Sequence, residues 1–560
     1  MIRERSALEP RTTAPASGAA DLWEAIARPS TLSRDLWEWT GSGFREGSWG
    51  DLLGSSCRAA AALRRRGVQR GEIVAAVITN SHAAIGGLVG AWFAGGRVAS
   101  LPVLARGMSP SQYVAQLRRL IGELDASVLL AEARFLELLP VEDGLGAELV
   151  SYESLLEGDG RADPEPLGRD EVVFIQYSSG TTGEPKGAML TADAIGNQLL
   201  RLAEAMELDP ERDVGVTWLP LSHDMGLFGC VLCAWAAGIP LLYGTPERFI
   251  TGPHTWLEDC AAVGATVTAA PPFALDLAAR SARRRVSGPL SVRTWLIGAD
   301  QIDWSRLTQG VEALAPLGVS LESITPAYGL SEATLAVTVG DLREAPNVVD
   351  VDGPALMAGN LESAAPDGPR ALRLVSAGSP IRDVRLRISE SVGEVRVRTP
   401  SLAAGYHGNE AETRRTFQDG ELRTGDVGLI VDGELYIVGR SDDVIVVGGR
   451  NVHAHELETR LGAHPGVRAG NCAMIDPRDG SGSVALVAEI DAGSVDEAAL
   501  AQALRRTAHE LAGVRVRQCL FLPRGRFPKT PTGKIQRFRC RALLADEAAG
   551  VHVPGHRQRR

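Results

Sequence analysis

The segment Gln176-Tyr-Ser-Ser-Gly-Thr-Thr-Gly-Glu-Pro-Lys-Gly187 separates two stretches of opposite character. Before it, Glu171–Gln176 is short, apolar and β-branched, which predicts a buried strand. After it, Thr191 can cap a helix whose apolar residues recur at helical spacing. A strand, a turn of small residues, a lysine and a helix follow one another, and this order is typical of a phosphate-binding site.

The chemistry of the turn supports that interpretation. Glycines let backbone N–H groups approach an anion, hydroxyls add donors, and Lys186 adds a point charge. The turn is not a Walker A loop, because the Gly-Lys-Ser/Thr spacing is absent. A flexible Ser/Gly turn is the alternative, and the length of the run disfavours it. The predicted phosphate-binding residues are Ser179, Gly180, Thr181, Thr182, Gly183 and Lys186.

The run Tyr177–Gly187 closely resembles the phosphate loop of the adenylate-forming superfamily. That superfamily comprises acyl-CoA synthetases, nonribosomal-peptide adenylation domains, luciferases and fatty-acyl-AMP ligases. The resemblance extends from about residue 40 to about residue 540. It implies an acid-activating ligase that uses ATP and Mg²⁺. Such an enzyme converts a carboxylate and ATP to acyl-AMP and pyrophosphate, and then passes the acyl group to a thiol.

Composition bounds the class of protein. With 560 residues, the chain is too long for one core, and two or more domains are expected. Hydrophobic residues make up 44% and charged residues 23%, as in soluble globular proteins. The net charge of −11 argues against nonspecific nucleic-acid binding, which needs a basic surface.

Seven scattered cysteines make a disulfide framework improbable and predict a reducing, cytoplasmic location. Cys230 and Cys233 form a C-x-x-C inside an apolar run, and we interpret them as core thiols. The first twenty residues lack the apolar region of a signal peptide. Met225–Pro246 carries no charge, but glycines and a proline interrupt it, which favours a buried helix and strand over a membrane span.

Apolar helices and strands alternate from Asp21 onward, and Arg58–Arg66 is expected to be a helix that Gly67 stops. This alternation predicts an α/β fold with a large N-terminal domain of helix-covered, mostly parallel sheets. Val348–Pro369 is expected to be loose, and Val384–Val397 alternates like a small antiparallel subdomain with one wet face. A small α+β domain follows. The expected units are a flexible tail (1–20), an adenylation domain (21–440), a mobile C-terminal domain (441–545) and a basic tail (546–560).

His223 and Asp224 directly follow an apolar strand in Trp218-Leu-Pro-Leu-Ser-His-Asp-Met-Gly-Leu227. Strand ends are where α/β sheets hold ligands, although a lone histidine is more often structural. Similar segments of fatty-acyl-AMP ligases imply that the imidazole lies beside the reacting carboxylate. Ser222 stands where tyrosine is usual in that family. The expected acyl pocket contains Met225, Gly226, Pro272 and Phe273.

Three further motifs predict the nucleotide site. The first two are Leu296–Asp300 and Ala327–Thr334. A flat base could lie between the backbone at the end of the first segment and the ring of Tyr328 in the second. Ser331 offers a hydroxyl to the α-phosphate, and Glu332 offers an oxygen to Mg²⁺. Asp426 suits the ribose hydroxyls, and Arg440 can hold a phosphate or a ribose edge. Turn residues without a ligand are the alternative for each. The family pattern implies adenine contacts from Gly298, Ala299, Asp300, Tyr328 and Gly329.

The segment Pro528-Lys-Thr-Pro-Thr-Gly-Lys-Ile-Gln-Arg537 is the last motif. Lysines in such a Pro/Gly loop are usually exposed and inert. The resemblance implies instead that Lys534 bridges the carboxylate and the α-phosphate. The expected catalytic residues are Lys534, His223 and Glu332. It also makes Asp442 the hinge about which the small domain swings, so that one site serves two reactions.

The sequence does not decide which thiol accepts the acyl group or which acid is activated. The histidine motif and the stretch Val348–Pro369 resemble fatty-acyl-AMP ligases, which transfer to the phosphopantetheine of a carrier protein. The partner that this resemblance implies is an acyl carrier protein or a polyketide synthase. At the position of Ser331, acyl-CoA synthetases have threonine and fatty-acyl-AMP ligases often have alanine. Serine is closer to threonine in chemistry, which favours CoA as the acceptor. An enzyme that retains one half-reaction, and a nucleotide-binding regulator, are further alternatives. A linear fatty, aryl or polycyclic acid is consistent with the small residues near Pro272. An amino acid is disfavoured, because the nearest acidic anchor, Asp276, is predicted to be helical.

Overall fold

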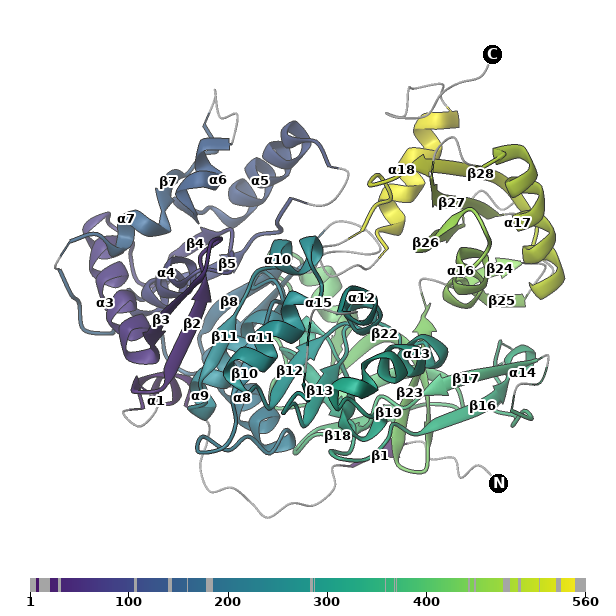
Figure 1. Ribbon diagram of the computed structural model, residues 1–560. Helices are drawn as coiled ribbons and strands as arrows, with labels where there is room; N and C mark the ends of the chain where they lie inside the picture. The colour runs from purple at the N-terminus through teal and green to yellow at the C-terminus, as the bar shows by residue number, and fades with distance from the viewer. Residues whose placement is uncertain are drawn as a thin grey trace.

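The structure is a computed structural model. It describes residues 7–9, 21–28, 32–104, 108–138, 144–158, 160–177, 185–282, 286, 288–357, 359–366, 368, 370–441, 444–447, 450–476, 484–491, 495–512, 514–529 and 535–548. The architecture is mixed α/β, with two mainly parallel sheets, an antiparallel sheet and a C-terminal α+β unit (Figure 1). The predicted fold class is confirmed.

The first sheet has the strand order β7-β6-β4-β5-β8-β9. All its neighbours pair in parallel except β9, which returns antiparallel after the predicted phosphate loop. β8 confirms the strand predicted before that loop, and Thr191 caps α8 by accepting the Ala194 N–H. The strands are β4 (Ile73–Ala76), β5 (Arg97–Ser100), β6 (Val128–Ala131), β7 (Glu148–Ser151), β8 (Val172–Tyr177) and β9 (Gly187–Thr191).

Helices cover both faces of this sheet. The helix expected at Arg58–Arg66 is longer than predicted, because Ser48 and Asp51 form a capping box that starts it at Trp49. α3, α4 and α7 pack together on one side (Figure 1). The helices are α1 (Leu22–Ala27), α3 (Trp49–Arg65), α4 (His82–Phe93), α5 (Pro110–Leu124), α6 (Ala133–Leu138), α7 (Tyr152–Leu156) and α8 (Ala192–Ala205).

The second sheet has the order β18-β15-β14-β13-β12-β10-β11-β2-β3, and β14 through β2 run parallel. Its strands are β2 (Asp35–Trp39), β3 (Phe44–Ser48), β10 (Gly215–Thr217), β11 (Leu241–Tyr243), β12 (Val267–Ala270), β13 (Thr294–Ile297), β14 (Ile324–Gly329), β15 (Ala336–Val339) and β18 (Ser379–Pro380). Its helices are α10 (Pro246–Thr251), α11 (Thr255–Val263), α12 (Phe273–Ala282) and α13 (Trp304–Leu314).

The uncharged stretch Met225–Pro246 is a buried helix and strand, as predicted. It forms the π-helix η1 (Met225–Leu232), then α9 (Cys233–Ala237) and β11. All seven cysteines are free, and burial raises the pKa of Cys230 to about 11 and that of Cys233 to about 12. The helices of the described ranges include none long and apolar enough to cross a membrane.

An antiparallel sheet, β1-β19-β20-β22-β21 with β23 beside β22, completes the N-terminal region. It alternates buried and exposed residues as predicted. Ala7 and Leu8 were expected in a loose tail, but they pair with β19 and Leu8 is buried. The elements are β1 (Ala7–Leu8), β19 (Arg385–Ile388), β20 (Gly393–Arg398), α15 (Glu410–Thr416), β21 (Phe417–Gln418), β22 (Glu421–Val431) and β23 (Glu434–Arg440).

The expectation of a loose chain over Val348–Pro369 is wrong for its first part. That part forms β16 (Val348–Asp352) and α14 (Gly353–Met357), and β16 pairs antiparallel with β17 (Ala371–Val375). The physical reason is burial: Val351 is fully buried in a small core with Leu374 and residues of β22 and β23. α14 also contacts β25 of the C-terminal unit.

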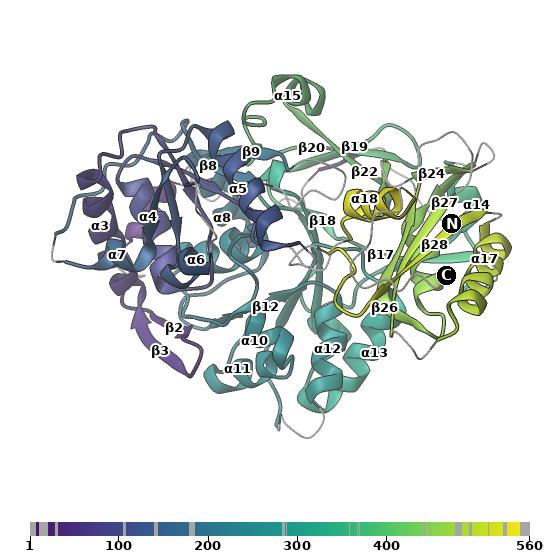
Figure 2. The ribbon, with the colours of Figure 1, turned by 90° about the horizontal axis from the view of Figure 1, so that it is seen from above.

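The C-terminal unit has its own buried clusters, separate from the large N-terminal core. It contains both strands and helices, as the predicted α+β character requires. Its described elements are β24 (Val444–Val447), β25 (Arg450–His453), α16 (Ala454–Gly462), β26 (Val467–Ile475), β27 (Val484–Ile490), α17 (Glu497–Ala512), β28 (Val516–Pro523) and α18 (Arg537–Ala548). Figures 1 and 2 show α16–α18 on the side of the molecule away from α3, α4 and α7. The exact domain boundaries stay a prediction.

Candidate active site

A cleft of about 3040 Å³ lies where the carboxyl ends of both parallel sheets meet the C-terminal unit. Residues that follow β4, β8, β10 and β13 line it from the sheets. Ile535, Gln536 and Arg537 line it from the C-terminal unit. Parallel α/β sheets hold ligands outside the carboxyl ends of their strands. The cleft is therefore the place to test the predicted site residues.

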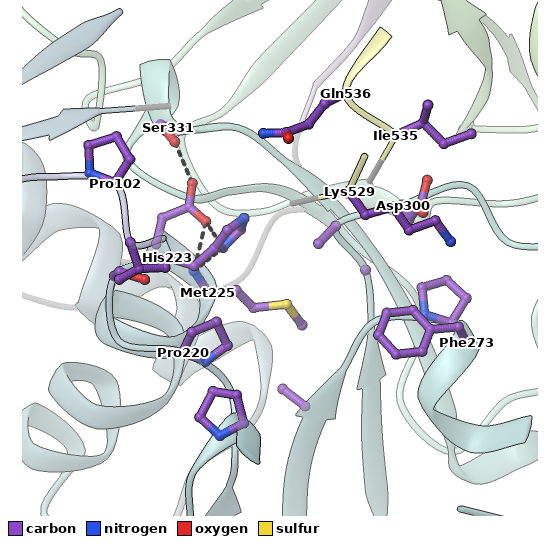
Figure 3. A pocket seen from close by; sticks show the side chains of 18 of the residues that line it. Pro102, Pro220, His223, Met225, Phe273, Asp300, Ser331, Lys529, Ile535 and Gln536 are labelled. Atoms are coloured by element: carbon purple, nitrogen blue, oxygen red, sulfur yellow. Dashed lines mark hydrogen bonds and ion pairs between the residues drawn. The ribbon is translucent and has the colours of Figure 1, made fainter. Parts of the chain in front are cut away.

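His223 and Ser331 are joined through one carboxylate (Figure 3). Nδ1 of His223 lies 2.6 Å from Oδ1 of Asp224, and the Ser331 hydroxyl donates to Oδ2 at 2.6 Å. The Met225 N–H donates to Oδ1 at 2.7 Å, a better contact than its 3.3 Å approach to Nδ1. Nδ1 therefore carries the proton, and Nε2 is the nitrogen left for a ligand. Sequence reasoning noted Asp224 but gave it no role.

Three of the four residues expected in the acyl pocket line the cleft. Met225, Pro272 and Phe273 line the cleft, and Figure 3 shows Met225 beside His223. Gly226 does not line it. A Cβ at Gly226 would lie 2.3 Å from the Pro220 carbonyl oxygen, so the glycine allows the π-helix to start close against the preceding strand end. Gly229 lines the cleft instead.

The predicted adenine residues all lie along the cleft. Gly298, Ala299 and Asp300 follow β13, and Tyr328 and Gly329 end the neighbouring strand β14. Ala299 has φ +67°, a left-handed conformation that non-glycine residues seldom adopt away from functional sites. A Cβ at Gly329 would lie 1.8 Å from the Leu335 carbonyl oxygen, so only glycine fits there.

The predicted ribose residues form a network with Tyr328, the tyrosine that is predicted to stack on the base. The Tyr328 hydroxyl donates to Oδ2 of Asp426 at 2.6 Å, and Nε of Arg440 lies 3.3 Å from Oδ1. β22 and β23 place Asp426 and Arg440 directly opposite each other. Burial, and then the Asp426 charge, raise the pKa of Tyr328 well above its ordinary value, so its hydroxyl stays a neutral donor.

The sequence analysis did not identify Glu412 and Tyr406, which contact the predicted phosphate-binding Lys186 and the predicted metal ligand Glu332. Lys186 forms an ion pair with Glu412 of α15, and its ammonium lies 5.4 Å from the centre of the Tyr406 ring. The Tyr406 hydroxyl donates to Oε1 of Glu332 at 2.7 Å. No local signal could have found these partners, because they lie 226 and 74 residues away along the chain.

Several predicted residues lie outside the described ones: Ser179, Gly180, Thr181, Thr182, Gly183, Asp442 and Lys534. Their flanking residues are described. Tyr177 and Lys186 line the cleft on either side of the phosphate loop. Lys529 and Ile535 form an antiparallel bridge at the base of the loop that carries Lys534, here called the lysine loop. Both line the cleft opposite His223 (Figure 3).

The carboxylates of the site fit a substrate-borne magnesium ion. Mg²⁺ is usually held by one or two protein carboxylates together with substrate phosphates. Glu332 lines the cleft and supplies such a carboxylate, and Tyr406 contacts both Glu332 and Lys186. Within the described ranges, no group of three or more His, Cys, Asp or Glu residues could hold a metal ion. A single carboxylate such as that of Glu332 fits Mg²⁺ that is held mainly by substrate phosphates.

Comparisons with known proteins agree with this geometry. Residues 35–407 match the model of the AMP-binding enzyme family. The chain is 30% identical over 450 residues to the long-chain-fatty-acid–AMP ligase FadD32 of Mycolicibacterium smegmatis, covering 69% of this chain and 70% of that one. It is 31% identical over 416 residues to the medium-chain-fatty-acid–[acyl-carrier-protein] ligase TtuA of Teredinibacter turnerae, covering 68% and 64% respectively.

The fold is also that of a solved fatty acyl-adenylate ligase from a study of the E. coli and L. pneumophila enzymes. The TM-score is 0.84 at 24% identity, over 95% of this chain and all of that one. The match to the family model covers more than half of the chain, and the cleft gathers the described residues of every predicted motif. The chain therefore belongs to the AMP-binding enzyme family and is an adenylate-forming acid–thiol ligase that uses ATP.

Proposed function

We propose that this enzyme activates a fatty acid as acyl-AMP and transfers the acyl group to the phosphopantetheine thiol of a carrier protein. The observation that carries the proposal is the arrangement across the cleft. His223 and the apolar residues Met225 and Phe273 share the cleft with Lys529 and Ile535 at the base of the lysine loop (Figure 3). The hydrogen-bonded pair Tyr328 and Asp426 lines the same cleft. An apolar acid and a nucleotide would then meet at one point.

Each residue of the cleft has a role in this proposal. Tyr328 stacks on adenine, with Gly298, Ala299, Asp300 and Gly329 beside it, and Asp426 and Arg440 hold the ribose. The phosphate loop and Lys186 hold the triphosphate, and Ser331 lies near the α-phosphate. Glu332 holds Mg²⁺, which when bound neutralises charge on the departing pyrophosphate.

The reaction needs no covalent bond to the protein. A carboxylate oxygen attacks the α-phosphorus in line, and the bond to the β-phosphate oxygen breaks. His223 holds the carboxylate, and the cleft excludes water from the two reactants. In the second step the carrier thiol attacks the acyl carbon and AMP leaves. Rotation of the C-terminal domain about Asp442 would exchange the residues that face the acyl-AMP.

Two observations favour a carrier protein over CoA as the acceptor. TtuA, a relative, is named for an acyl-carrier-protein substrate. In addition, the hairpin of β16, α14 and β17 packs on the antiparallel sheet and contacts β25 of the C-terminal unit. The fatty-acyl-AMP ligase branch is expected to restrain its small domain with an insertion at this point, which disfavours CoA.

Lys534 is the catalytic cation of this proposal. Lys534→Ala should lower the rate of adenylation by roughly 10²–10³-fold, the loss typical when one preorganised donor to a developing charge is removed. Nucleotide binding should persist, because the Tyr328 and Asp426 contacts remain. Near-normal adenylation by Lys534→Ala, measured as pyrophosphate release, would refute this role. Lys529→Ala, on the same loop, tests whether any lost charge has the same effect.

Mass spectrometry of the products tests the acceptor. The purified enzyme is supplied with Mg·ATP and fatty acids of graded length, with CoA, with a phosphopantetheinylated carrier protein, or with neither. We expect acyl-AMP alone and with CoA, and acyl-carrier protein when the carrier is present. Formation of acyl-CoA at a comparable rate would assign the enzyme to the CoA ligases. Aryl or polycyclic acids used in preference to fatty acids would overturn the substrate class.

A further inference from the structure

The backbone that carries His223 is held from the other parallel sheet. His223 belongs to the segment that follows β10 of the second sheet, whereas the phosphate loop follows β8 of the first. Two buried side-chain amides, those of Asn80 and Gln176, cross between the sheets at this point. Both line the cleft, and they are 8% and 2% exposed.

Asn80 uses both ends of its amide. Its Nδ2 donates to the carbonyl oxygens of Leu219 and Gly244 at 2.8 and 2.9 Å, and its Oδ1 accepts the Leu221 N–H at 3.0 Å. Asn80 follows β4 of the first sheet. Its three partners follow β10 and β11 of the second sheet. One side chain therefore fixes the ends of two strands and the backbone two residues before His223.

Gln176 holds the next residue. It is part of β8, and its Nε2 donates to the Ser222 carbonyl at 3.1 Å and to the Tyr177 carbonyl at 3.3 Å. Ser222 is bonded to His223, and Tyr177 leads directly into the phosphate loop. The same amide nitrogen thus links the residue before the histidine to the residue before the phosphate loop.

These contacts are costly to remove. A buried carbonyl without its donor loses the free energy of hydration without compensation, and the backbone shifts to recover it. A shift of about 1 Å in an active site can lower a rate by as much as about 10²-fold, because the reacting atoms must be aligned. In the proposed function, a shift of the His223 backbone relative to the strand that leads into the phosphate loop would misalign the carboxylate and the α-phosphorus.

We propose that Asn80 and Gln176 are positioning residues that set the spacing between the acid subsite and the phosphate subsite. This inference rests on the proposed function, in which His223 holds the carboxylate and the loop holds the triphosphate. The two residues touch neither reactant in this proposal. They act through the backbone of Leu219–Ser222 and through the strand that carries the loop.

The half-reactions separate positioning from general stability. Adenylation must bring two separate molecules into line, but a preformed acyl-AMP already carries the acyl group and the phosphate in one molecule. Loss of the amides should therefore affect the first half-reaction far more than the second. A residue that only stabilises the fold would lower both in proportion.

The variants are Gln176→Met, which keeps the shape of the side chain, and Asn80→Ala. Asn197→Ala is the matched control, because Asn197 is also 8% exposed and hydrogen-bonded but lies on α8 away from the cleft. For each, we measure the kcat of acid-dependent adenylation, the KM for ATP and acid, acyl transfer from synthetic acyl-AMP to the acceptor that the wild type uses, and Tm.

Gln176→Met and Asn80→Ala should lower the kcat of adenylation by roughly 10–100-fold, with little change in KM or in acyl transfer. Asn197→Ala should change Tm but neither half-reaction. Equal losses in both half-reactions, or normal adenylation by both variants, would overturn the inference. If Asn80→Ala does not fold, Gln176→Met alone decides. A wild type that adenylates no acid would instead refute the proposed function.

Discussion

The two sides of the cleft are built differently. On the acid side, where His223 lies, the buried Asp224 carboxylate is bonded to uncharged donors and an imidazole. On the nucleotide side, the carboxylates pair with cations: Asp426 with Arg440, and Glu412 with Lys186 and Arg415. The acid side is thus held by short hydrogen bonds. The nucleotide side also has short hydrogen bonds, from Tyr328 to Asp426 and from Tyr406 to Glu332, but it adds ion pairs at partly exposed side chains.

The difference suggests how each side meets its ligand. Hydrogen bonds to a buried carboxylate are costly to break, so His223 should keep its orientation when the acid binds. Partly exposed ion pairs contribute little stability, so Lys186 and Arg440 can exchange a carboxylate for a phosphate or ribose at low cost. The acid side is preorganised and the nucleotide side is exchangeable. The variants below test this distinction.

Asp426→Asn should have the largest effect of the three. The amide keeps the shape but removes the charge that suits the ribose hydroxyls and Arg440. A hydrogen bond to a charged group contributes about 1.5–3 kcal/mol, so the KM for ATP should rise roughly 10–100-fold. The KM for the acid should not change. Asp432→Asn is the control, because Asp432 is exposed in the turn at the other end of the same strand pair.

Steady-state kinetics at varied ATP and varied acid separate the two constants. If Asp426→Asn raises the KM for the acid rather than for ATP, the two sides are not independent and the comparison fails.

Ser331→Ala tests the acid side. It removes the hydroxyl that donates to Oδ2 of Asp224, and a hydrogen bond to a charged group contributes about 1.5–3 kcal/mol. The kcat of adenylation should fall about tenfold, because the orientation of His223 loosens. Ser331→Thr keeps the hydroxyl and should stay near the wild type. A rise in the KM for ATP without a fall in kcat would show that Ser331 acts on the phosphate instead.

Glu412→Gln should have the smallest effect. Burial tends to raise the pKa of Glu412, but its bonds to Arg415 and Lys186 outweigh this and lower it below 4.5. The folded pKa is therefore depressed, so the ion pairs stabilise the fold above the unfolded pKa. That stability is lost as the pH falls below about 4.5 and through the folded pKa. At neutral pH it amounts to about 1 kcal/mol or less, because Lys186 is partly exposed.

Urea unfolding between neutral pH and acid checks this. Wild type should lose unfolding free energy more steeply than Glu412→Gln as the pH falls. Glu410→Gln is the control on the same helix, since Glu410 pairs with Arg414 at an exposed position. Indistinguishable acid profiles for wild type and Glu412→Gln would mean that the ion pair contributes nothing measurable.

The features that could be predicted from the sequence are those that depend on residues close together in the chain. Strand β8 and the Thr191 cap are set by residues within one turn or strand, and each motif lies beside the strand end that places it in the cleft. Asp426 and Arg440 were assigned to one ligand, and the hairpin of β22 and β23 places them opposite each other.

The rest depended on contacts between distant segments. Nothing near Lys186 indicates Glu412, and nothing near His223 indicates that Asn80 holds its backbone. The π-helix at Met225 and the hairpin at Val348 depend on packing against neighbours that only the fold brings close. The hydrogen bond from Ser331 to Asp224 also joins segments 107 residues apart.

Acid-dependent exchange of labelled pyrophosphate into ATP tests the central claim most directly, because it reports acyl-AMP formation without any thiol acceptor. The account predicts that exchange needs Mg²⁺ and an added acid, that fatty acids support it best, and that His223→Ala abolishes most of it. Exchange without an acid, or none with any fatty acid by a folded enzyme that binds ATP, would contradict the account.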